Sequence, residues 1–411
     1  MTKRYKLKFK DLDALNAAIA IESEDLETQV VSTKRHFVSF APSRAAFAKA
    51  GLAAEALETP GPAQGSLDRL AQEFGADLVE DYQYELDDEG MELFEAPVDI
   101  DEEGTLDDVL DMVRARDAWD RSRGEGVTIA VVDTGIDGSN AEFPKWKRAG
   151  DWTPTGDKPW TDWQGHGTMC ACISAATRAE GGRYDGIAPD AKIMACKTRF
   201  YDSELASIYD AIEERAKGGE RIVATNSFGR KVGTPPPPPQ ESDFLPALED
   251  AIAAGVTVVF SAGNNHERAG GVPYECTPNS VWLHKSRADV LAVATCDLER
   301  EMWYYSSRGP GQFFGQANTN RKPDVTGPTP RNGRILYGAG DRVLPNGWGT
   351  SGACPQAAGL AALLIAVRPN LSALDVFEAV RSGAVGIGKG ELCQGDGMID
   401  CDASLSRVLT S

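Results

Sequence analysis

Five short apolar runs, separated by helical stretches, constrain the fold of this chain more than any other feature. The runs are rich in β-branched residues and have no polar face, which is typical of strands buried on both sides. They cover residues 126–132, 192–196, 222–226, 256–261 and 290–294, and helical patterns fall at 167–176, 205–217 and 245–254. Strands that alternate with helices form a parallel sheet covered on both faces. We therefore predict an α/β fold with functional residues at the carboxyl ends of the strands.

The first ninety residues follow a different order. Strand patterns occur at 4–9, 28–32, 36–40 and 77–85, and helical patterns at 11–21, 43–57 and 66–74. This β-α-β-β-α-β order, with one extra helix, predicts a small two-layer α+β domain of ferredoxin-like type. The segment from Glu85 to Asp108 is strongly acidic and contains no Lys or Arg. We predict an N-terminal domain over 1–90, an exposed acidic linker over 91–105 and the α/β domain over 106–411.

Charge and cysteine content narrow the classes of partner. The chain has 411 residues and a net charge of −20, which argues against binding to nucleic acid or to an anionic membrane. No apolar run follows the basic N-terminus, so we expect no secretory signal, and a location in the cytoplasm or export by another route.

Free thiols are then the main expectation for the eight cysteines. Cys393 and Cys401, which bracket a Gly-Asp-Gly turn, are the best candidates for a disulfide. No CxxC pair is present, so we expect no zinc site.

A serine lies where a loop meets a helix in the stretch from Gly347 to Gly359. The apolar run that follows, Leu360 to Val367, indicates a buried helix. Ser351 is therefore open to two interpretations. It is either an ordinary N-capping serine or a nucleophile near unpaired backbone N–H groups that stabilise an oxyanion. The second interpretation requires a base and a carboxylate elsewhere in the chain.

Candidates for both occur in the same half of the chain. Asp133 ends the first buried strand, in Asp-Thr-Gly, and His166 opens a helix in Gly-His-Gly-Thr. Asn264 follows another buried strand, where its carboxamide can donate to an oxyanion. Taken alone, each is as compatible with a turn or capping residue as with a catalytic one.

Taken together, the order Asp133, His166, Asn264, Ser351 resembles that of the subtilisin-like serine peptidases, the subtilases. The pattern Gly-Thr-Ser-x-Ala-x-Pro-x-x-x-Gly around Ser351 is also similar to theirs, and the resemblance spans about 106–411. It implies a subtilisin-like parallel sheet and a serine endopeptidase that acts through an acyl-enzyme. Ser351 would be the nucleophile, His166 the general base, Asp133 its orienting carboxylate and Asn264 an oxyanion donor.

The resemblance also implies where a substrate binds. Ser227, Phe228 and Gly229 would form the edge that pairs with an extended protein or peptide substrate. Ser261, Ala262 and Gly263 would form a wall of the pocket for the side chain before the cut. These small, uncharged residues favour apolar or mixed side chains there. The run Pro235–Pro239, in an insertion that starts at Lys231, is either a rigid surface loop or a lid over this cleft.

Subtilases are commonly made with an N-terminal domain that blocks the cleft until it is cut off. The resemblance therefore implies that residues 1–90 act as an inhibitor of the enzyme. We expect self-cleavage between Leu93 and Leu106, or alternatively a permanent regulatory domain. No cofactor is expected, although subtilases often bind calcium, which we assign to no residue.

Two other functions remain open. The first is a dedicated peptide-maturation protease, or a peptide ligase or macrocyclase, on the same fold. The second is a catalytically inactive binding module, against which the complete set of candidate catalytic residues argues.

Overall fold

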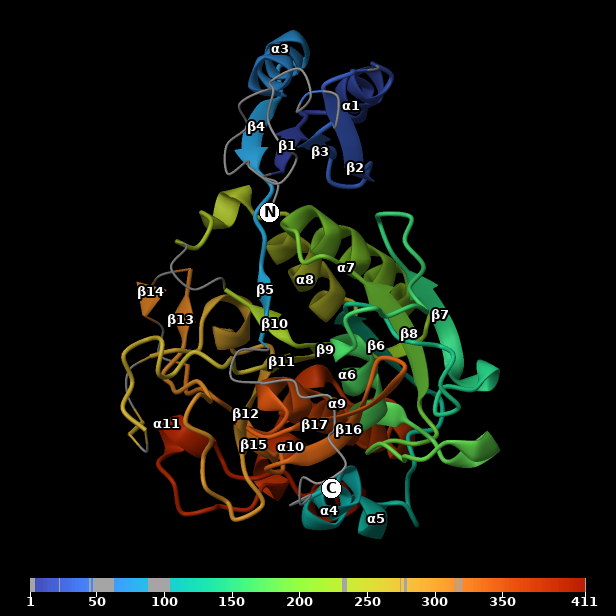
Figure 1. Ribbon diagram of the computed structural model, residues 1–411, viewed down its shortest axis with the longest axis vertical. Coiled ribbons are helices and arrows are strands. Elements are labelled where there is room, and N and C mark those ends of the chain that lie inside the picture. The colour runs from blue at the N-terminus through green and yellow to red at the C-terminus, as the bar shows by residue number, and fades with distance from the viewer. Residues whose placement is uncertain are drawn as a thin grey trace.

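The computed structural model shows a small N-terminal lobe above a larger body (Figure 1). It describes residues 4–21, 23–43, 46, 63–87, 104–230, 235–273, 275–276, 279–314, 316–317 and 320–410. The predicted helix at 43–57 and the predicted acidic linker therefore lie almost wholly outside the described residues.

A seven-stranded sheet forms the centre of the larger domain, and every neighbouring pair of its strands is parallel. Across the sheet the strands are β15 (Val325–Pro328), β12 (Leu291–Cys296), β11 (Thr257–Ser261), β9 (Arg221–Asn226), β6 (Val127–Asp133), β8 (Lys192–Lys197) and β7 (Arg148–Trp152). The five predicted strands are confirmed. The two edge strands, β7 and β15, were not predicted, because β7 is polar and β15 contains Gly and Pro.

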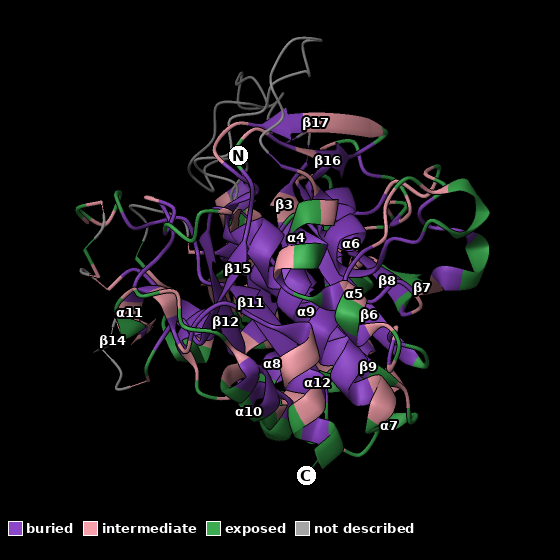
Figure 2. Ribbon diagram, turned by 90° about the horizontal axis from the view of Figure 1, so that it is seen from below, coloured by how far each residue is buried: buried purple, intermediate pink, exposed green. Residues whose placement is uncertain are grey.

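Helices cover both faces of this sheet, as predicted. One face carries α6 (His166–Ala175), α9 (Gly349–Val367), α10 (Ala373–Gly383) and α12 (Cys401–Thr410), and the other carries α7 (Asp202–Lys217) and α8 (Phe244–Ala253). Figure 2 shows that α9 is buried along most of its length, whereas α7 and α10 expose their outer sides. By length and composition α9 could cross a membrane, but 89% of its apolar window is buried inside the protein.

Shorter elements complete the larger domain. The predicted helix at 106–122 is two helices, because Arg114 between them takes a left-handed conformation (φ 55°). They are α4 (Leu106–Met112) and α5 (Ala115–Ala118), and the remaining elements are α11 (Glu391–Gln394) and the hairpins β13–β14 (Gln312–Phe313, Gln316–Ala317) and β16–β17 (Gly333–Tyr337, Gly340–Leu344). Four 3₁₀ turns lie at Lys145–Lys147, Ala179–Gly181, Pro239–Glu241 and Leu283–Ser286.

The N-terminal lobe has the predicted α+β order and its own apolar core. Its antiparallel sheet has the order β2-β3-β1-β4, with β1 (Tyr5–Lys8), β2 (Leu26–Ser32), β3 (Phe37–Pro42) and β4 (Asp77–Glu80), and its helices are α1 (Leu12–Ile19) and α3 (Gln64–Phe74). Ser66 does not cap α3, which begins two residues earlier. Val30 and Phe37 belong to the apolar cluster of α7 and α8, so the sheet of this lobe packs on those helices.

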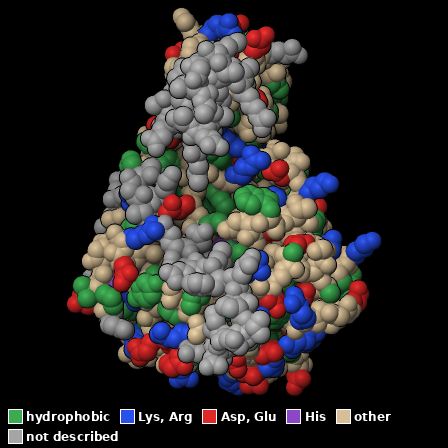
Figure 3. All heavy atoms as spheres, in the orientation of Figure 1, with side chains coloured by type: hydrophobic (Ala, Val, Ile, Leu, Met, Phe, Trp, Pro, Cys, Tyr) green, Lys and Arg blue, Asp and Glu red, His purple; other side chains and the backbone are tan. Residues whose placement is uncertain are grey.

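Ion pairs reinforce the junction between the lobe and the body, where Figure 3 shows charged side chains of both signs. The ammonium of Lys6 is fully buried and lies 2.7 Å from both Asp202 Oδ2 and Asp243 Oδ2. Arg4 lies 2.6 Å from Glu204, also in a buried position. Burial alone would raise the pKa of Asp202, but Lys6 and further hydrogen bonds outweigh it and lower that pKa. This carboxylate therefore stabilises the junction at neutral pH and loses its contribution in acid.

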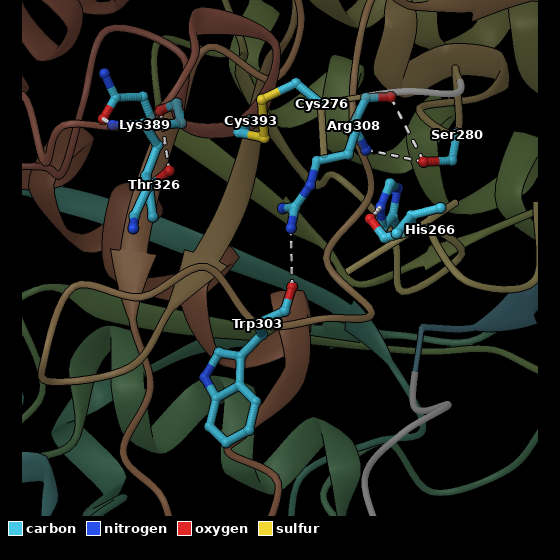
Figure 4. The surroundings of a disulfide bond; sticks show 10 residues. His266, Cys276, Ser280, Trp303, Arg308, Thr326, Lys389 and Cys393 are labelled. Atoms are coloured by element: carbon cyan, nitrogen blue, oxygen red, sulfur yellow. Dashed lines mark hydrogen bonds between the residues drawn. A yellow bond between two sulfur atoms is a disulfide. The ribbon is translucent and has the colours of Figure 1, made fainter. Parts of the chain in front are cut away.

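A disulfide joins Cys276 to Cys393, 117 residues apart in the sequence (Figure 4). The predicted Cys393–Cys401 pair is wrong, because Cys401 begins α12 and its side chain is buried in the core beneath α9. Cys401 is one of six buried free cysteines, so the expectation that most thiols are free is confirmed.

Replacing Lys6 tests whether the lobe is docked through its buried charge. Lys6→Met would leave Asp202 and Asp243 buried without their cation, and we expect docking to weaken by about 3–5 kcal/mol. Hydrogen exchange of the full chain should then speed up in α7 near Asp202, whereas Lys10→Met, at an exposed position, should change nothing. Unaltered exchange in Lys6→Met would show that the ion pairs do not hold the lobe.

Candidate active site

Asp133 and His166 meet at the carboxyl end of β6. His166 Nδ1 lies 2.9 Å and 3.0 Å from the two carboxylate oxygens of Asp133. The N–H of Thr134 donates to the same carboxylate at 2.8 Å. Both side chains are almost completely buried. His166 Nε2 is buried and has no hydrogen-bond partner among the described residues, so it is available to exchange a proton with a substrate.

Glycines on both elements permit this contact. A Cβ on Gly167 would lie 2.2 Å from the carbonyl oxygen of Gly135 and 3.0 Å from Cβ of Asp133, so the backbones of α6 and of the turn after β6 touch directly. Gly165 and Gly135 have φ of 101° and 105°, which side-chain-bearing residues rarely adopt. The glycines that flank His166 and follow Asp133 are therefore required for the imidazole and the carboxylate to meet.

Ser351 is the third residue of α9, and its hydroxyl faces the same cleft. Pro355 lies in the second turn of this helix. Because proline has no N–H, it leaves the carbonyl of Ser351 without its helical partner. Ser227 Oγ donates to that carbonyl at 3.4 Å, and Cys170 Sγ lies 3.6 Å from it. Because its helical hydrogen bond is missing, the carbonyl of Ser351 is free to contact Cys170 of α6 and Ser227, which follows β9.

Asn264 follows β11, and its carboxamide is held in one orientation. Its Oδ1 accepts hydrogen bonds from the N–H of Thr350 at 3.0 Å and from the hydroxyl of Thr350 at 2.8 Å. The Nδ2 group is therefore directed into the cleft, as an oxyanion donor must be. Thr350 was not singled out from the sequence, although its place beside Ser351 was the available signal.

A segment of the N-terminal region lies across this cleft. Strand β5 (Glu85–Leu86) leaves the N-terminal lobe and pairs antiparallel with β10 (Phe228–Gly229), as Figure 1 shows. The N–H of Asp87 continues the pairing by donating to the carbonyl of Ser227 at 3.1 Å. The predicted substrate edge thus binds an extended chain as an added strand.

The carbonyl oxygen of Asp87 lies among the catalytic candidates. It accepts a hydrogen bond from Ser351 Oγ at 2.7 Å and another from Asn264 Nδ2 at 2.7 Å. The candidate nucleophile and the candidate oxyanion donor therefore converge on one peptide carbonyl. The cut predicted between Leu93 and Leu106 falls mainly on residues outside the described part of the chain, so it stays a prediction.

The side chain of Asp87 enters a pocket beside Ser261. The hydroxyl of Ser261 donates to Asp87 Oδ2, and Lys285 Nζ forms a buried ion pair with the same oxygen. Ala262 and Gly263, also predicted here, are buried next to Ser261. The expectation of an uncharged pocket is wrong, because Lys285 reaches it from a distant 3₁₀ turn. No sequence signal marked Lys285, which lies in the 3₁₀ turn Leu283–Ser286, far from Asp87 in the sequence.

The run Pro235–Pro239 lies at the surface, with most of its residues exposed, and is tied to the N-terminal region at its first residue. The hydroxyl of Tyr82 donates to the carbonyl of Pro235 at 2.7 Å. Lys6 Nζ donates to the carbonyl of Glu241 at 3.1 Å, just beyond the run. The first part of the insertion, residues 231–234, lies outside the described residues. These contacts join the insertion to the N-terminal region.

The electrostatics of the site favour a charged imidazole. Burial by itself would lower the pKa of His166, but the adjacent Asp133 carboxylate, with a smaller contribution from Cys170, raises the pKa well above its ordinary value of 6.5. The Asp133 carboxylate thus stabilises the protonated form of this imidazole.

Among the described residues, two groups of side chains have spacings compatible with a metal ion. One is Asp133, His166 and Cys170, in which the carboxylate and the imidazole already bind each other. The other is the acidic cluster of Asp210, Glu213 and Asp250, which Lys34 and Arg35 neutralise from the N-terminal lobe. Neither group gives calcium a site of its own.

Comparisons with known proteins agree with this geometry. The model of the subtilase family, Peptidase_S8, matches residues 124–396. Mycosin-4 of Mycobacterium tuberculosis is 28% identical over 314 residues, which are 70% of this chain and 66% of that protein. A calcium-dependent protease of a Nostoc species is 29% identical over 64% of this chain and 42% of its own length.

Solved structures show the same fold. The crystal structure of MycP1 with its N-terminal propeptide removed superposes with a TM-score of 0.56 at 22% identity, over 72% of this chain and 97% of that one. Since the family match covers most of the larger domain, from just before β6 to beyond Ser351, the chain belongs to the subtilase family of serine peptidases.

Proposed function

We propose that this protein is a serine endopeptidase made as a zymogen, and that it cuts its own chain after Asp87. The observation that carries the proposal is the position of the Asp87 carbonyl, 2.7 Å from both Ser351 Oγ and Asn264 Nδ2. The strand pairing of β5 with β10 supports it, because the segment is held in the extended form that a protease requires.

The residues divide the chemistry among them. Ser351 Oγ attacks the carbonyl carbon of Asp87, and its proton passes to His166 Nε2. The carbonyl oxygen becomes an oxyanion, which Asn264 Nδ2 stabilises by its hydrogen bond. The C–N bond to residue 88 then breaks, and His166 returns the proton to the leaving amine. Water, deprotonated by His166, hydrolyses the ester on Ser351 and restores the hydroxyl.

Asp133 acts by orienting and stabilising His166. Its carboxylate accepts the Nδ1–H of the imidazole, which leaves Nε2 as the nitrogen that exchanges protons. The N–H of Thr134 fixes the carboxylate in turn. The burial of Asp133 and His166 shields their contact from bulk water.

The same contacts make the N-terminal region an inhibitor of the enzyme. While β5 pairs with β10 and Asp87 fills the pocket, no other peptide can bind there. Lys6 and Arg4 precede Asp87 in the chain, and their ion pairs join the lobe to the larger domain. These pairs therefore do not depend on the bond after Asp87 being intact. The lobe is therefore expected to stay bound after cleavage until acid or proteolysis removes it. MycP1, which has the same fold, is also made with an N-terminal propeptide.

Self-cleavage can be followed by intact mass spectrometry. We expect the wild-type chain to convert into fragments 1–87 and 88–411, and Ser351→Ala to stay intact. Ser406→Ala, at a surface helix position, is the matched control and should be processed like the wild type. A wild-type chain that stays uncut after long incubation, as Ser351→Ala does, would contradict the proposal.

Loss of the oxyanion donor should slow the reaction without unfolding the protein. Asn264→Ala removes one donor to the Asp87 carbonyl, and we expect the rate of self-cleavage to fall about 10²–10³-fold. Asn370→Ala, in an exposed turn, is the control. A rate within a factor of two of the wild type would show that Asn264 does not stabilise the oxyanion.

The rate of self-cleavage should rise with pH. His166 must be neutral to accept the serine proton, and its raised pKa keeps it protonated at pH values where an ordinary histidine is neutral. The rate should therefore climb through a titration above pH 6.5, measured from the full-length fraction left at fixed times. A rate that is flat or falls over this range would contradict the role of His166 as general base.

A further inference from the structure

The pocket that receives Asp87 contains a buried positive charge. Asp87 and Lys285 expose only 4% and 3% of their surface. Lys285 Nζ and Ser261 Oγ both donate to Oδ2 of Asp87. The carboxylate is therefore held by one charged and one neutral donor, away from bulk water.

The backbone of the cleft brings the ammonium to this position. A Cβ on Gly229 would lie 2.7 Å from Lys285 Nζ and 3.3 Å from Oδ1 of Asp87, and a Cβ on Gly263 would lie 3.5 Å from the same Nζ. The ammonium thus lies between the substrate edge and the wall of the pocket. Because Gly229 is part of β10, the strand that binds the substrate backbone also borders the ammonium that contacts the substrate side chain.

Within the described part of the chain, Asp87 is the one acidic ion-pair partner of Lys285. Without a carboxylate in the pocket, the ammonium would be a buried charge with no counter-ion from the larger domain. Such a charge costs several kcal/mol, which a bound carboxylate offsets and an amide or alkyl group does not.

We propose that Lys285 makes this pocket selective for an aspartate as the residue whose carbonyl is attacked. The proposal rests on the proposed function and adds to it the class of substrate: acidic segments cut on the carboxyl side of Asp. Ser261 is the second selective group, because its hydroxyl donates to the same carboxylate oxygen. The acidic region from which Asp87 comes is a substrate of this class within the chain itself.

Self-cleavage of full-length variants provides the test, because it does not require release of the N-terminal lobe. The rates of wild type, Asp87→Asn, Asp87→Leu, Lys285→Met and the double variant Asp87→Leu with Lys285→Met would be measured by intact mass. We expect Asp87→Asn and Asp87→Leu to slow cleavage after residue 87 about 100-fold. Lys285→Met should slow cleavage when residue 87 is Asp and speed it when residue 87 is Leu. Lys192→Met, at the exposed start of β8, is the control.

Each outcome decides the matter. If wild type cleaves after Asp87, and Asp87→Asn and Asp87→Leu cleave after residue 87 at similar rates, the pocket is not selective for aspartate. The proposed function then stands. Cleavage of wild type at another bond also overturns the selectivity. If wild type makes no cut but its Ser351 takes a fluorophosphonate label, the selectivity and the proposed self-cleavage both fail, and a reactive serine is all that remains of the proposed function. With neither cut nor label, the proposed function fails as well. Should Lys285→Met not fold, the Asp87 variants decide on their own.

Discussion

Close packing of helices α6 and α9 against the chain that follows β6 and the loop before β8 is the constraint on which the rest of this structure depends. A Cβ on Gly167 of α6 would meet the carbonyl oxygen of Gly135 at 2.2 Å, and a Cβ on Gly359 of α9 would meet Cβ of Ile187 at 2.5 Å. With helices packed this closely, side chains from α6, α9 and the strand ends share one cleft. Interiors packed at such density have few alternative arrangements. His166, Asp133 and Ser351 therefore hold their positions through the fold itself rather than through mobile loops.

The N-terminal region contacts the larger domain in three places. Its sheet packs on α7 and α8 through Val30 and Phe37 and is tied there by buried ion pairs. Its last described strand extends the substrate edge, and its Asp87 places one group in the oxyanion site and another in the side-chain pocket. A peptide bound in this way is both a substrate and an obstacle to other substrates. Cleavage after Asp87 does not break the contacts between the N-terminal sheet and helices α7 and α8. Cleavage of the chain and release of the N-terminal lobe are therefore separate events.

Much of this arrangement could be predicted from the sequence, because it is encoded locally. The buried strands are continuous β-branched runs, and the catalytic candidates stand at strand and helix ends flanked by glycines. What could not be predicted depends on contacts between distant segments. Lys285 lies in a stretch with no pattern of its own, and its contact with Asp87 joins residues far apart in the sequence. Cys393 pairs with Cys276 across 117 residues, a choice that local spacing cannot reveal. The strand β7 is too polar to be recognised by its periodicity.

The central claim is that Asp87 occupies the active site as a substrate residue. A crystal structure of full-length Ser351→Ala, in which the chain cannot be cut by Ser351, tests this most directly. The account predicts density for residues 85–87 paired with β10, with the Asp87 carbonyl within hydrogen-bond distance of Asn264 Nδ2 and its carboxylate against Lys285 Nζ. A cleft that is empty, or filled by residues from the 91–105 segment with Lys285 unpaired, would contradict it.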